Sequence, residues 1–144
     1  MSPQSAVLAV DHGTKRTGFA STDALRTAEW PLECWHGPGD SDELIEHIAA
    51  LVAERDAGTV LVGLPLNMDS TEGERAKEVR GFIKHVQTRL EGVNVLPWDE
   101  RLTTRSAEDL LHEAGFHGDK LKARRDSWSA LVLLRDWLET GELS

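Results

Sequence analysis

Residues 59–65, TVLVGLP, form a short run that is apolar from its second residue to its last. Runs of this kind are typical of strands buried on both faces, and such strands occur in parallel sheets that helices cover on both sides. This single run therefore favours an α/β fold.

Four other segments have the composition of strands. Residues 6–11, AVLAVD, are apolar up to a final aspartate, and residues 17–21, TGFAS, follow a polar turn and run back as a hairpin. Residues 29–35, EWPLECW, predict a third strand, which Pro31 places at an edge of the sheet. Residues 93–100, VNVLPWDE, predict the fifth.

Two segments have the 3.6-residue period of amphipathic helices. One begins at Asp40, with Glu43 three residues on, and its apolar face consists of Leu44, Ile45, Ile48, Leu51 and Val52. The apolar face of the other consists of Ala76, Val79, Ile83, Val86 and Leu90. A short helix over residues 105–115 and a last helix over residues 126–138 complete the prediction.

The order of these elements predicts one α/β domain over residues 1–144. Its five-stranded mixed sheet has three antiparallel strands first and carries helices on both faces. No apolar run approaches the roughly 20 residues of a membrane span, the first residues do not resemble a signal peptide, and the single cysteine favours a reducing compartment. We therefore expect a cytoplasmic protein with no membrane partner.

The charge of the chain is unevenly distributed. The formal net charge is −9, which by itself argues against sequence-independent binding of nucleic acid. Residues 40–57 hold six acids and one arginine, whereas residues 119–126, DKLKARRD, hold four basic residues among eight. We expect an acidic solvated helix and a basic loop, a combination that is compatible with a nuclease.

Acidic residues follow two of the predicted strands. Asp11 ends the first strand, and Asp99 and Glu100 end the fifth. Open α/β sheets bind ligands outside the carboxyl ends of their parallel strands. A third acid, Asp126, begins the last helix on the same face as the apolar residues four, seven and eleven positions on, so we expect it to point inward.

Three acids at one end of a sheet would suit Mg²⁺ or Mn²⁺, which prefer oxygen ligands. Two such ions about 4 Å apart can stabilise the attacking and leaving oxygens of a phosphodiester. Each acid also has an ordinary explanation: Asp126 as a helix N-terminal acid, and Asp99 or Glu100 as a loop acid. Asp11 is the strongest candidate, because a buried carboxylate requires a partner or a metal.

Four segments, AVDHGTKRTGFA, VLVGLPLNMDSTEG, DERLTT and RDSWSALVLLRDWL, resemble the YqgF/RuvX family, from about residue 6 to residue 138. This family comprises bacterial pre-16S rRNA nucleases, also described as Holliday junction resolvase-like proteins. The resemblance implies a ribonuclease H-like fold and a metal-dependent nuclease. It assigns the catalytic and metal-binding roles to Asp11, Asp126 and one acid of DER, for which Glu100 is preferred over Asp99.

Basic residues beside these acids are the predicted nucleic-acid contacts. Arg16 and Arg101 either touch phosphate or form salt bridges that orient the acids, and both alternatives stay open. The full predicted set consists of Lys15, Arg16, Arg101, Lys120, Lys122, Arg124 and Arg125. Thr103 and Thr104 are expected to cap the helix that follows.

Two residues depart from the family pattern. Ser70 stands where the family usually has a glycine, which would serve a positive φ. Arg125 stands before Asp126 where an apolar residue is common, and enlarges the basic patch. Neither change removes a carboxylate.

Three other functions compete with RNA processing. Sugar kinases and actin-like ATPases share the DHGT-type turn, but they hold nucleotide between two such domains. A non-catalytic transcription or ribosome-assembly factor would not need all three acids. A junction resolvase needs two sites in a two-fold dimer and a broad basic face, whereas this chain, as a monomer or homodimer, has a narrow one. We therefore expect RNA as the substrate rather than junction DNA.

Overall fold

The computed structural model describes residues 5–100, 115 and 119–141, and for residues 119–126 it describes the backbone. The strands and helices of this part of the chain are β1 (Ala6–Asp11), β2 (Arg16–Thr22), β3 (Glu29–Pro31), β4 (Trp35–His36), α1 (Asp42–Arg55), β5 (Ala57–Leu64), α2 (Glu74–Arg89), β6 (Asn94–Asp99) and α4 (Asp119–Asp136). A π-helical turn, Trp137–Gly141, extends α4.

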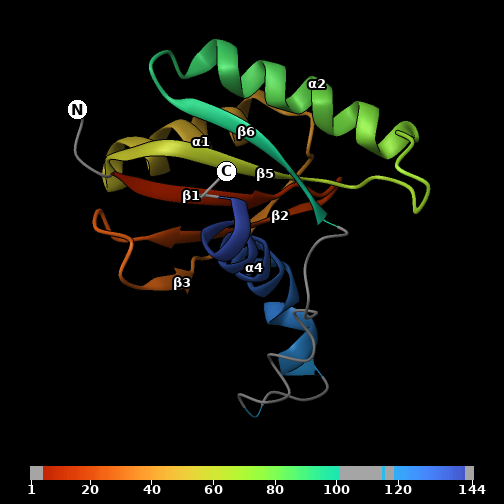
Figure 1. The fold of residues 1–144 in the computed structure, drawn as a ribbon. Helices are drawn as coiled ribbons and strands as arrows, with labels where there is room; N and C mark the ends of the chain where they lie inside the picture. Colours follow the sequence, from red (N-terminus) through yellow and green to blue (C-terminus); the bar gives the residue numbers. More distant parts are fainter. Residues whose placement is uncertain (1–4, 101–114, 116–118, 142–144) are drawn as a thin grey trace.

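The strands form one mixed sheet in the order β3-β2-β1-β5-β6, and β4 also pairs with β2 (Figure 1). β1 is antiparallel to β2 and parallel to β5, which is in turn parallel to β6. Val10 lies opposite Val62, and Leu64 lies opposite Asp99. The carboxyl ends of β1, β5 and β6 therefore meet at one end of the sheet.

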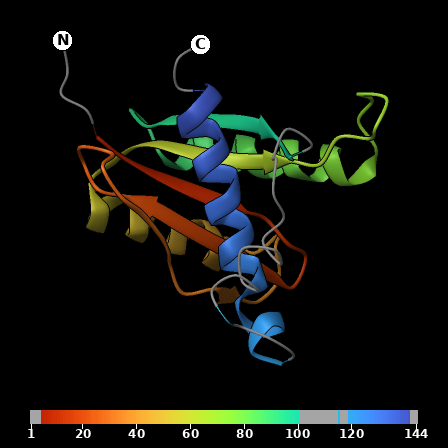
Figure 2. The ribbon, with the colours of Figure 1, turned by 60° about the horizontal axis from the view of Figure 1, so that its bottom comes forward.

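Helices cover both faces of this sheet, as predicted. α1 and α2 lie on one face, and α4 crosses the other (Figures 1 and 2). Val60 and Val62 of β5 belong to the core under α1 and α2, whereas Leu61 belongs to the core under α4. This division confirms that the TVLVGLP run is buried on both faces.

The apolar faces predicted for α1 and α2 are the faces that pack on the sheet. Leu44, Ile48 and Val52 are buried, and Ile45 and Leu51 pack at their margin. All five predicted positions of α2, together with Phe82, are buried. The start of α1 differs by one residue: Ser41 is the N-cap, because its Oγ accepts a hydrogen bond from the Leu44 amide at 3.3 Å.

The prediction of five strands was wrong by one. Residues 29–35 form two short strands instead of one, and these pair with opposite ends of β2: β3 pairs with Ala20–Thr22, and β4 pairs with Arg16 and Thr17. Pro31 ends β3 because it has no N–H to donate to the ladder. Its predicted position on an edge strand is confirmed.

The predicted basic loop is helical. α4 begins at Asp119, so the segment with Lys120, Lys122, Arg124 and Arg125 forms its first turns. The stretch contains no glycine or proline, and its Lys, Leu, Ala and Arg residues favour a helix. Asp126 is therefore in the interior of the helix, not at its start, and the dipole explanation does not apply beyond the first turn.

Other predictions fall outside the described residues. The helix predicted over residues 105–115 is one of these predictions, because only Gly115 of this range is described. Gly115 has a φ of 92°. Arg101, Thr103 and Thr104 also lie outside. Among the described helices, none has the length and apolar composition needed to cross a membrane.

Candidate active site

The carboxyl groups of Asp11 and Glu100 lie within hydrogen-bonding reach of each other at the carboxyl end of the sheet, a contact that requires one of them to hold a proton when no cation is bound. Asp11 is the last residue of β1, and Glu100 directly follows β6. β5 lies between these two strands, so the Glu100 side chain reaches across it toward Asp11. Glu100, the preferred acid of the DER segment, is therefore placed beside Asp11.

Gly63 of β5 makes this approach possible. A Cβ atom at this position would lie 2.4 Å from Glu100 Oε1 and 2.9 Å from its Cγ. Any side chain at residue 63 would therefore push the Glu100 carboxyl group away from its position over β5. Because Gly63 has no side chain, the Glu100 carboxyl group can lie directly over the backbone of β5.

The environment of Glu100 disfavours its charge. Burial raises the pKa of its carboxyl group above the usual value, and the nearby Asp99 charge adds to the increase. The hydrogen bond with Asp11 and the charge of Arg75 oppose the increase in the pKa of Glu100. Two neighbouring carboxyl groups, one of them desolvated, are unfavourable when no cation is present.

The donors of this pair fit a hard divalent cation. Both are carboxyl groups, and carboxylate oxygens are the ligands that such cations prefer. Within the described residues, no group of three His, Cys, Asp or Glu side chains is close enough together to hold a metal ion. The predicted third acid, Asp126, is not among the residues whose side chains the structure describes.

The later turns of α4, the helix that carries Asp126, pack on the sheet. Ala130, Leu133 and Trp137, which are four, seven and eleven positions after Asp126, all belong to the core between α4 and the sheet. Two polar contacts fix the C-terminal end of α4: Trp98 Nε1 donates to Asp136 Oδ2 at 2.9 Å, and Arg135 Nε pairs with Glu29 Oε1 at 2.8 Å. These contacts describe α4 from residue 127 onward, and the inward orientation of Asp126 stays a prediction.

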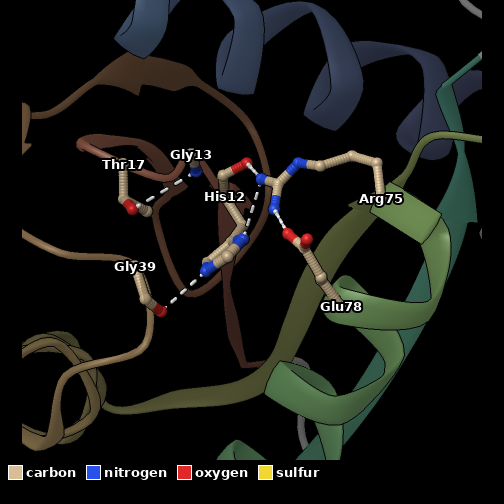
Figure 3. Close-up of polar contacts among 6 residues, drawn as sticks. All are labelled: His12, Gly13, Thr17, Gly39, Arg75 and Glu78. Carbon is tan, nitrogen blue, oxygen red and sulfur yellow. Dashed lines mark hydrogen bonds and ion pairs between the residues drawn. The ribbon is translucent and has the colours of Figure 1, made fainter.

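A second polar cluster forms around His12, the residue that follows Asp11 in the chain (Figure 3). His12 Nε2 donates to the Gly39 carbonyl at 2.8 Å, and its Nδ1 lies 2.9 Å from Arg75 Nη2. Arg75 Nη2 also donates to the His12 carbonyl, and Nη1 pairs with Glu78 at 2.9 Å. Burial, and then the charge of Arg75, lowers the pKa of His12, so the neutral imidazole predominates.

The sequence analysis missed Arg75 and His12. Arg75 is the second residue of α2, where a cation is unfavourable for the helix dipole. That misplaced charge was an available signal of an interaction outside the helix. His12 carried no such signal, because a histidine in a turn is ordinary.

The predicted basic contacts are only partly placed by the structure. Lys15 and Arg16 are exposed, and they follow Asp11 by four and five positions in the sequence. For Lys120, Lys122, Arg124 and Arg125 the structure describes the backbone, and Arg101 lies outside the described residues. Ser70 has a φ of 72°, which confirms the expectation of a positive φ at this position.

Solved structures share this fold at low sequence identity. *T. thermophilus* RuvC in complex with a Holliday junction substrate matches with a TM-score of 0.58 and 13% identity, over 96% of this chain and 97% of that chain. The Fowlpox virus resolvase in complex with Holliday junction DNA matches with a TM-score of 0.59 and 10% identity, over 94% and 97%. These similarities confirm the predicted ribonuclease H-like fold.

Sequence comparison is more specific. A protein of Anaeromyxobacter sp. named "Putative pre-16S rRNA nuclease" is 41% identical over 92% of this chain and 95% of its own length. One of the same name from Acetivibrio thermocellus is 36% identical over 93% and 95%. The model of the RuvX family, described as Holliday junction resolvase, matches residues 5–140. The chain, with its acid pair at the carboxyl end of a ribonuclease H-like sheet, therefore belongs to the RuvX family.

Proposed function

We propose that this protein is a divalent-metal-dependent nuclease that processes RNA, with 5′ maturation of pre-16S rRNA as its role. The observation that carries the proposal is the Asp11–Glu100 pair, held together over Gly63 despite the cost of bringing two acids close. A bound cation would offset the repulsion between the two acids, so that both could act as its ligands. The family membership and the names of the relatives support the same activity.

Each acid has a part in this proposal. Mg²⁺ or Mn²⁺, held by Asp11, Glu100 and Asp126, would supply Lewis acidity toward the phosphodiester. Asp11 and Glu100 come from rigid strand ends and fix two carboxylates relative to each other. Asp126 would approach from α4, which lies on the opposite face of the sheet from α1 and α2.

The basic residues would hold the substrate strand. Lys15 and Arg16 follow Asp11 and are exposed, and the first turns of α4 precede Asp126 with four basic residues. Arg101 likewise follows Glu100, so each of the three acids has basic residues near it in the sequence that can bind phosphates. A narrow footprint on a chain of net charge −9 suits one RNA strand better than four duplex arms.

The substrate preference is tested by offering a pre-16S rRNA fragment and a four-way DNA junction at matched salt, with Mg²⁺, Mn²⁺, Ca²⁺ or EDTA. We expect RNA cleavage with Mg²⁺ or Mn²⁺ and little with Ca²⁺, whose looser coordination misplaces the attacking water. Equal rates in EDTA would contradict the metal role. Paired symmetric nicks in the junction, faster than RNA cleavage, would make a dimeric resolvase the better function.

We further infer a cytoplasmic location. The single cysteine requires no oxidising compartment, and the proposed RNA substrate is made in the cytoplasm of bacteria.

A further inference from the structure

Two parts of the chain converge on the side chain of His12. The loop before α1 accepts a hydrogen bond from Nε2 through Gly39, and α2 provides both Arg75 and the ring of Phe82. The centroids of the His12 and Phe82 rings are 4.1 Å apart. Both ring nitrogens of His12 are therefore engaged, although the residue lies in a turn.

Packing alone does not hold this ring. A cavity of about 560 Å³ opens beside it, lined by Thr14, Asp40, Ile45 and His85 among others. The turn itself is tightly constrained: a Cβ at Gly39 would lie 2.2 Å from the Gly13 carbonyl oxygen. The hydrogen bonds to the ring and backbone therefore determine how the turn sits on α1 and α2.

Arg75 makes the most extensive contacts in this cluster. One guanidinium nitrogen contacts both the backbone carbonyl and Nδ1 of His12, and another pairs with Glu78. A planar guanidinium can hold two acceptors in a fixed relation, which a lysine ammonium cannot reproduce. Arg75 does this from the first turn of α2, where its charge is unfavourable for the helix itself.

We propose that Arg75 is a positioning residue for the active site, which acts by holding the peptide of His12 and thereby the carboxylate of Asp11. The inference rests on the proposed metal-dependent activity. Residues behind metal ligands commonly set the affinity for the metal by orienting those ligands. Arg75 would have this role without contacting the metal or the RNA.

The test compares Arg75→Lys with Arg80→Lys by Mn²⁺ titration calorimetry and by kcat and KM for RNA cleavage. Arg80 is a matched control, because it lies on the same helix and makes an equivalent two-pronged contact with Glu72, at 2.9 and 3.0 Å. We expect Arg75→Lys to raise the Kd for Mn²⁺ roughly tenfold and to lower kcat similarly, with little change in KM. Arg80→Lys should change neither.

Wild-type Mn²⁺ affinity and kcat in Arg75→Lys would overturn the inference, since this variant keeps the charge and loses only the geometry. If Arg75→Lys does not fold, Glu78→Ala replaces it: it removes the acceptor on one side of the guanidinium at an exposed position, and an Mn²⁺ Kd raised about threefold is expected. An unchanged Kd in that variant would also overturn the inference. Asp11→Asn separates the two proposals, because wild-type Mn²⁺ binding by Asp11→Asn would refute the metal site itself.

Discussion

Asp11 and His12 are neighbours in the chain but have opposite surroundings. Asp11 faces another acid, Glu100, whose charge is already disfavoured by burial. His12 is surrounded by complementary partners, with Gly39, Arg75 and the Phe82 ring each contacting it. The comparison indicates that the fold can hold two acids close together, at a cost in stability, when the neighbouring residue His12 is fixed by several contacts.

The largest expected effect comes from removing the negative charge of Asp11. Asp11→Asn keeps the side-chain volume and loses the negative charge, so RNA cleavage should fall by roughly a thousandfold or more. Thermal stability in EDTA should stay the same or increase, because repulsion with Glu100 is reduced. Activity assays and thermal unfolding of the same preparation measure both effects. Full cleavage by the variant would refute the role of Asp11.

A smaller effect is expected from moving Glu100 without changing its chemistry. Gly63→Ala places a methyl group where the Glu100 carboxyl now lies. The flexible end of the glutamate can move aside, so the melting temperature should change little while cleavage falls roughly 10- to 100-fold. Leucine at position 64 is a neighbouring control: Leu64→Val should affect stability through packing more than activity. Unchanged cleavage in Gly63→Ala would show that the position of Glu100 is unimportant.

The two neighbouring groups should also give opposite pH dependences in the metal-free protein. The pKa of Glu100 is raised from 4.5, so the folded state binds its proton more tightly, and stability falls as the pH rises from about 4.5 through the raised value. The pKa of His12 is lowered from 6.5, so the unfolded chain takes up the proton first, and stability falls as the pH drops below about 6.5.

Urea unfolding in EDTA at several pH values measures both slopes. Glu100→Gln should remove the contribution that is lost with rising pH, and His12→Asn should remove the one that is lost with falling pH. The comparison between the two residues fails if both substitutions alter the same pH range.

The smallest effect is expected away from both groups. Ser70 has a φ of 72° in the loop before α2. A non-glycine residue in the left-handed region is strained, so Ser70→Gly should raise the free energy of unfolding by about 0.5 kcal/mol, after the entropy cost of glycine. Chemical denaturation measures this change, and cleavage should be unaffected. A loss of stability would indicate that the serine side chain contributes more than its backbone strain costs.

Local sequence patterns predicted much of this molecule. The TVLVGLP run, the apolar faces of α1 and α2 and the edge position of Pro31 all follow from burial and hydrogen bonding within one element. Asp11 was identifiable because a carboxylate at the end of an apolar strand is unusual. Two predictions were wrong. The highly charged segment over residues 119–126 was predicted as a loop but forms the first turns of α4, and the single strand predicted over residues 29–35 is two strands that pair with opposite ends of β2.

The sequence by itself determined most of the element types, the ribonuclease H-like fold through family resemblance, and the candidacy of Asp11. Only the tertiary structure places the Glu100 carboxyl group beside Asp11, because that placement depends on the missing side chain of Gly63 on a neighbouring strand. The contact between Arg75 and His12 likewise joins residues 63 positions apart. Such contacts depend on how strands and helices are placed in space, and no local periodicity records that placement.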